Sequence, residues 1–83
     1  MNLLTTVYLM EKHGLRLDLE ALAAELGSTP ANLRRKISAE DFEIPTYMDG
    51  GKRWADVRDV AAHLDERRAQ ALKAHQRAAG VAA

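Results

Sequence analysis

Cysteine is absent from this sequence of 83 residues. Without thiols the chain forms no disulfide and offers no thiolate ligand to a metal. Such a chain suits a reducing compartment, so we expect the protein to act in the cytoplasm. Its length corresponds to one domain, at the small end of those that fold unaided.

Long hydrophobic runs are also absent. No stretch approaches the ~20 consecutive apolar residues that cross a bilayer. The first ten residues, MNLLTTVYLM, lack the basic segment of a signal peptide, and no small-residue cleavage site follows them. We therefore expect a cytosolic protein with an intact N-terminus and no membrane contact.

The usual groupings of catalytic and metal-binding residues are missing. His13, His63 and His75 are far apart in the sequence and share no metal-ligand spacing. The chain shows no paired acids for catalysis and no nucleophile with an adjacent base, and DGGK is too short for a phosphate-binding loop. We expect a protein that is not an enzyme and that holds no metal or cofactor.

An excess of charge of either sign is lacking too, because twelve basic side chains balance twelve acidic ones. Evidence for a nucleic-acid partner must therefore come from where the charges lie. The segment LGSTPANLRRKIS, residues 26–38, contains three consecutive basic residues and no acid. Acids then follow closely, at Glu40, Asp41 and Glu43.

Glycines and caps divide the chain into short elements. TTVYLMEKHG predicts a first helix that begins after Thr5 or Thr6 and ends at Gly14. Leu15–Leu17 alternates apolar and basic residues and predicts a short edge strand.

The next helix is indicated by DLEALAAELG, with Asp18 as its N-cap and Gly27 at its end. One apolar stripe follows the helical period, at Leu19, Leu22, Ala23 and Leu26.

A further helix begins almost at once, because Thr29 can cap it and Pro30 suits its first position. Leu33 and Ile37 are four residues apart and are expected to face inward. The polar residues then fall largely on the remaining surface, at Asn32, Arg34, Arg35 and Lys36.

IPTYM and KRWA flank DGG, a turn signal that predicts a β-hairpin. Trp54 follows the turn and is expected to fill space between the hairpin and the last helix, the alternative being a base-stacking role. Asp56 is expected to cap that helix, whose inward stripe is Val57, Val60, Ala61 and Leu64.

The pattern weakens after Arg67 to alanines around Leu72. This end of the chain could be exposed, frayed or packed on another copy of the protein.

Two helices joined by about three residues with a glycine indicate a helix-turn-helix, and the hairpin makes it winged. We therefore predict a mostly α fold with a small β-hairpin, a winged helix-turn-helix. In that arrangement the second helix enters the major groove of DNA and the hairpin tip reaches flanking DNA. The hairpin carries a second basic pair, Lys52 and Arg53.

The segments LDLEALAAELGSTPANLRRKIS and IPTYMDGGKRWADVRDVAAHLDERR resemble the small winged-helix regulators of phages and prophages. These are the excisionases and the Cox-type and AlpA-type regulators, with pyocin activators as relatives. The resemblance covers residues 5–68, so we expect a DNA-binding domain over residues 1–68 and an extension over 69–83. It implies a factor that binds short repeated sites on double-stranded DNA, often cooperatively. Such a factor directs an integrase (a recombinase) toward excision or regulates transcription.

By position, the resemblance places the recognition helix at Pro30–Ile37 and the wing at Met48–Arg53. Asn32 could contact adenine edges or serve the capping turn. The DNA-binding residues we expect are Ser28, Thr29, Ala31, Asn32, Arg34, Arg35, Lys36, Lys52 and Arg53.

Two further expectations concern partners. The alternative to DNA binding is a winged-helix adaptor whose basic patch docks on an acidic protein. For assembly, we expect a monomer or weak dimer that associates cooperatively on DNA, with the end of the chain as the coupling element.

Overall fold

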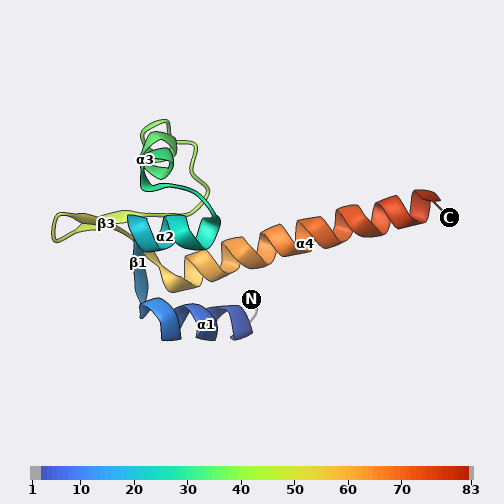
Figure 1. The fold of residues 1–83 in the computed structure, drawn as a ribbon, viewed down its shortest axis with the longest axis horizontal. Helices are drawn as coiled ribbons and strands as arrows, with labels where there is room; N and C mark the ends of the chain where they lie inside the picture. The colour runs from blue at the N-terminus through green and yellow to red at the C-terminus, as the bar shows by residue number, and fades with distance from the viewer. Residues whose placement is uncertain (1–2, 83) are drawn as a thin grey trace.

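The computed structural model describes residues 3–82 and is mostly helical, with a small three-stranded antiparallel sheet (Figure 1). A mostly α fold with a small β part is thus confirmed. The elements in chain order are α1 (Leu3–His13), β1 (Arg16–Asp18), α2 (Leu19–Leu26), α3 (Pro30–Ser38), β2 (Tyr47–Asp49), β3 (Lys52–Asp56) and α4 (Val57–Ala82).

Helix α1 contains both threonines that were expected to cap it, so that prediction is wrong. Thr6 is buried, and the Thr5 hydroxyl donates to Asp65 Oδ1 at 2.8 Å. Thr5 therefore ties α1 to α4, and neither threonine begins the helix. The helix ends as predicted before Gly14, which has φ 84°.

Helices α2 and α3 begin where the sequence predicts, α2 ends as predicted before Gly27, and α3 extends one residue past the expected Ile37. Asp18 accepts a hydrogen bond from the Ala21 amide at 2.9 Å, and Thr29 accepts one from the Asn32 amide at 3.1 Å. Between the helices, Gly27 adopts a left-handed conformation with φ 66°. The two caps and this glycine fix a joint of three residues between the helices.

The β2–β3 hairpin turns at Gly50 and Gly51, which have φ 61° and φ 79°. Positive φ at both positions matches the DGG signal, because two-residue hairpin turns require it. Strand β1 pairs antiparallel with β3, with Leu17 opposite Ala55, and forms one edge of the sheet as predicted.

The core lies where α1, α2, α3 and the first half of α4 meet one another and the inner face of the sheet. The predicted inward stripes of α2 and α4 are confirmed, with Leu26 and Leu64 packed at the edge of the core. Its largest fully buried side chains are Leu9, Leu17, Leu22, Leu33, Val57 and Val60.

Trp54 lies on the outer face of the sheet, so its expected place in the core is wrong. Side chains alternate along β3, and the inward position goes to Ala55, which is fully buried. The Arg16 guanidinium covers the Trp54 ring at 4.0 Å from its centroid. The indole Nε1 donates to the Asp49 carbonyl at 3.0 Å.

Helix α4 continues far past the core (Figure 1). Every residue from 70 to 80 is exposed, so this second half of α4 is an uncovered helix. We call residues 67–82 the α4 extension.

Candidate nucleic-acid interface

Helix α3 packs against the core through Leu33, whose side chain is 1% exposed. That contact turns Ala31, Arg34 and Arg35 toward solvent, and all three are exposed. The outer surface of α3 therefore combines one small residue with two guanidinium groups.

Asn32 links the start of α3 to Arg35. Its amide nitrogen Nδ2 donates to Ser28 Oγ at 2.9 Å, and its Oδ1 accepts from Arg35 Nη2. The Asn32 side chain thus serves the capping turn, the second of its two expected roles, and orients Arg35. Thr29 uses its own hydroxyl for the cap.

Lys36 lies on a different side of α3 from Arg34. It lines a hollow at the back of the helix together with Asp41, Glu43 and Arg67. The three consecutive basic residues therefore do not form one surface, as their spread of about 200° around the helix requires.

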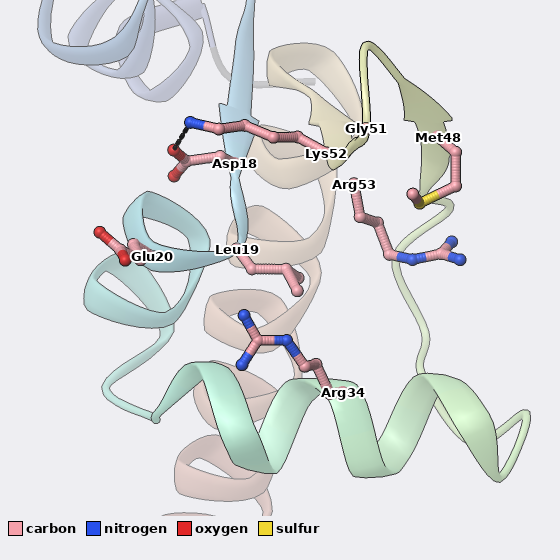
Figure 2. A pocket seen from close by; sticks show the side chains of 8 residues that line it. All are labelled: Asp18, Leu19, Glu20, Arg34, Met48, Gly51, Lys52 and Arg53. Atoms are coloured by element: carbon pink, nitrogen blue, oxygen red, sulfur yellow. Dashed lines mark ion pairs between the residues drawn. The ribbon is translucent and has the colours of Figure 1, made fainter.

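A cleft of about 340 Å³ separates the start of α2 and the face of α3 from the β2–β3 hairpin. Figure 2 shows Arg34 rising from α3 into this cleft, with Arg53 and Met48 of the hairpin at its other side. Within residues 3–82, no hydrogen bond or ion pair occupies the Arg34 guanidinium. The fold therefore gathers cations from α3 and the hairpin that lie far apart in sequence.

The two basic residues of the hairpin are held differently. Arg53 Nη1 donates to Thr46 Oγ1 at 2.9 Å, which fixes its side chain at the base of the hairpin. Lys52 Nζ lies 3.8 Å from Asp18 Oδ2, a long and exposed ion pair. Lys52 is thus free to turn toward another anion at little cost.

Two acids, Asp18 and Glu20, share the cleft with the three cations. Asp18 is already engaged by the Ala21 amide and by Lys52. Glu20 is exposed at the first turn of α2. The cleft as a whole is basic by one charge. Figure 2 shows Arg34 rising from α3 into the cleft, while Lys52 reaches toward Asp18 and Arg53 extends outward beside Met48.

Arg16 and Asp49 brace the hairpin, and sequence reasoning missed both. Arg16 Nη1 donates to Asp49 Oδ2 at 2.7 Å while the same guanidinium covers Trp54. The hydrogen bond to Asp49 raises the pKa of Arg16. Residues 33 positions apart come together only through the β1–β3–β2 strand order, so no local sequence signal reveals this contact.

His13, Lys12 and Glu25 join the end of α1 to α2. Glu25 Oε1 lies 2.7 Å from His13 Nε2 and 3.1 Å from Lys12 Nζ. The hydrogen bond with His13, followed by that with Lys12, holds the pKa of Glu25 below its usual value. These residues are remote from the cleft and act in the fold.

In the part of the chain that the structure describes, no cluster of His, Asp and Glu residues could hold a metal ion. Nor does any helix of that part have the length and apolar character needed to cross a membrane. Comparisons with protein-family models, with curated proteins and with solved structures give no match for this chain.

Proposed function

We propose that this protein is a winged helix-turn-helix protein that binds double-stranded DNA. In this proposal α3 enters the major groove and the β2–β3 hairpin, as the wing, contacts flanking DNA. The proposal rests on one observation: Arg34 of α3 and Lys52 and Arg53 of the hairpin line the same open cleft.

Helix α3 and the β2–β3 hairpin have different roles in the proposed DNA binding. Arg34 and Arg35 leave an exposed helix face, from which guanidinium groups can reach base edges or phosphates. Lys52 and Arg53 sit on a hairpin beside that face and suit the phosphate backbone, which dominates the affinity of such proteins. Ala31 leaves room at the start of α3 for close approach to a base pair.

A single domain of this kind covers only ~600–1,000 Å² on DNA. Strong selectivity therefore requires several adjacent sites, which fits a factor that assembles cooperatively. The resemblance to phage and prophage regulators supports the role of an excisionase or a transcriptional regulator, with an integrase as a further partner in the first case.

The test is fluorescence anisotropy of a labelled random-sequence duplex at increasing salt, followed by selection from a randomised duplex pool. Four basic contacts to phosphate predict that the log of affinity falls with log salt with a slope of about −3 to −4. Selection should then enrich a short motif. Absence of duplex binding even at low salt would overturn the proposal and favour the adaptor with an acidic protein partner.

A further inference from the structure

Helix α1 exposes most of its large apolar side chains. It buries only Thr6 and Leu9, yet five large apolar side chains along its length are exposed. They are Leu3, Leu4, Val7, Tyr8 and Met10, at 75%, 76%, 41%, 51% and 41% exposure. At about 100° per residue, three of them surround Glu11 on the side opposite the buried one, and the other two, Leu3 and Met10, lie on its flank.

The α4 extension carries a matching side. Asp65 contacts α1 through Thr5, and Ala69 and Leu72 follow Asp65 at the helical spacing of four and seven residues. The side of α4 that holds α1 therefore continues past the start of α1, where Leu72 is 43% exposed. The extension is about 24 Å long and α1 about 16 Å, so the extension is long enough to cover a helix such as α1.

The net charge of the chain changes sign at residue 67, where the α4 extension begins. Residues 1–66 contain eight Lys and Arg against twelve Asp and Glu, a net charge of −4. Residues 67–83 contain four basic residues and no acid, a net charge of +4. Because the extension is a continuation of one helix, it cannot fold back onto its own acidic body.

We infer that a second copy of this chain covers both surfaces. Each α4 extension lies along the exposed side of the partner's α1, and the same contact is made twice around a two-fold axis. Each α1 is then held between its own α4 and the extension of the partner. The +4 extension meets a −4 body, and Leu72 meets apolar side chains of α1.

A DNA duplex fits these surfaces less well than a second copy. DNA phosphates would pair with the basic residues of the extension but would leave the apolar side of α1 in water. The basic side chains at Lys73 and Arg77 also lie on a different side of α4 from Leu72 by helical spacing. The inference is independent of the proposed DNA-binding function, since α3 and the hairpin take no part in it.

The test is sedimentation equilibrium of the full chain at concentrations up to about 100 µM. We expect twice the chain mass of 9.2 kDa. Val7→Glu and Leu72→Glu, both at exposed positions, should each raise the dissociation constant of the dimer at least roughly tenfold. Gln70→Glu adds the same charge on another side of α4 and should weaken the dimer much less than Leu72→Glu does. Circular dichroism verifies that each variant is folded.

A wild-type mass of 9.2 kDa throughout that range would overturn the inference without reference to any variant. So would a dimer that Val7→Glu and Leu72→Glu leave intact. Replacing Lys73 and Arg77 with Ala decides whether the extension binds DNA instead. Loss of affinity for a random-sequence duplex in a protein that is always monomeric would assign the extension to DNA.

Discussion

Arg34, Arg35 and Lys36 follow one another in the chain and have three different surroundings. Arg34 points into the cleft beside the hairpin, and Arg35 is oriented by Asn32 on the outer face of α3. Lys36 lines a hollow behind α3, next to two acids. These three basic residues, within one turn of α3, thus allow the effect of surroundings on DNA binding to be compared at constant charge.

Alanine at each of these three positions should affect DNA binding unequally. Arg34→Ala and Arg35→Ala should weaken it, with a salt slope reduced by about one for a lost phosphate contact or a cost of ~1–3 kcal/mol for a lost base contact. Lys36→Ala removes the same charge and should change affinity less than about twofold, because its side chain faces away. Anisotropy titrations on selected and scrambled duplexes measure this. A larger loss for Lys36→Ala than for Arg34→Ala would mean that α3 is rotated differently on DNA.

Asp56 caps α4 and is held by Arg58, whose hydrogen bonds lower the pKa of the Asp56 carboxyl to about 2. Because this pKa lies below the ordinary 3.8, the charged form stabilises the fold above about pH 4, and the contribution is lost as the pH falls toward 2. Asp56→Ala should cost about 1 kcal/mol at pH 7.

Urea unfolding at several pH values measures this contribution. The difference between wild type and Asp56→Ala should shrink between pH 4 and pH 2. Glu11→Gln, which removes an exposed acid on α1, is the matched control. A difference that stays constant over this pH range would show that the Asp56 charge adds nothing to the cap.

At the scale of single elements, the sequence predicts much of the fold because caps and glycines act locally. Asp18, Thr29 and Gly27 define α2, α3 and their joint through contacts within four residues, and such signals are present in the sequence itself. Which face of an element is buried depends on packing against elements that are distant in the sequence. Trp54 shows this, because the pairing of β3 with both neighbouring strands gives the buried position to Ala55.

The candidate site is likewise predictable from local sequence signals only in part. The residues of α3 and the hairpin can be predicted from their positions after Thr29 and the DGG turn. The way these residues group in space cannot be predicted from the sequence. Lys36 lies at the back of α3 and Arg16 braces the hairpin only because of how the elements pack. The apolar outer side of α1 is hidden for the same reason, since the sequence does not show that Thr6 is the residue buried.

Gly27 sets the angle between α2 and α3 by its left-handed backbone. A Cβ at this position would meet no atom within 4 Å, so Gly27→Ala adds backbone strain without a clash. We expect it to lower the free energy of unfolding by about 1 kcal/mol. Gly80→Ala, also in open space but inside α4, is the control and should not destabilise the protein. Equal stability of the two variants in urea would show that the joint does not depend on this conformation.

On the scale of the whole molecule, the hairpin tip and the C-terminus lie at opposite ends of a particle 54 Å long (Figure 1). The proposed DNA cleft and the proposed surfaces for a second copy therefore use separate parts of the chain. Under both proposals, α3 and the hairpin would bind DNA while α1 and the α4 extension contact a neighbour.

Removal of residues 70–83 should separate these two properties. Residues 70–80 are all exposed and none of them belongs to the core, so the fold and single-site DNA binding should change little. The binding curve on a duplex with several adjacent sites should become less steep, because neighbouring proteins lose the α4 extension that is proposed to connect them. Titrations of one-site and multi-site duplexes with both proteins measure it. Equal steepness would show that the α4 extension does not couple neighbours and would turn attention to the hairpin or α1.

The central claim is that α3 and the β2–β3 hairpin form the surface that binds DNA. Chemical-shift mapping of the ¹⁵N-labelled protein during titration with a random-sequence duplex at low salt tests it most directly. If α3 and the hairpin bind DNA, the amides of residues 28–36 and 48–53 should shift most and those of α1 and the α4 extension least. Shifts confined to α1 and α4, or none on any element at low salt, would contradict it.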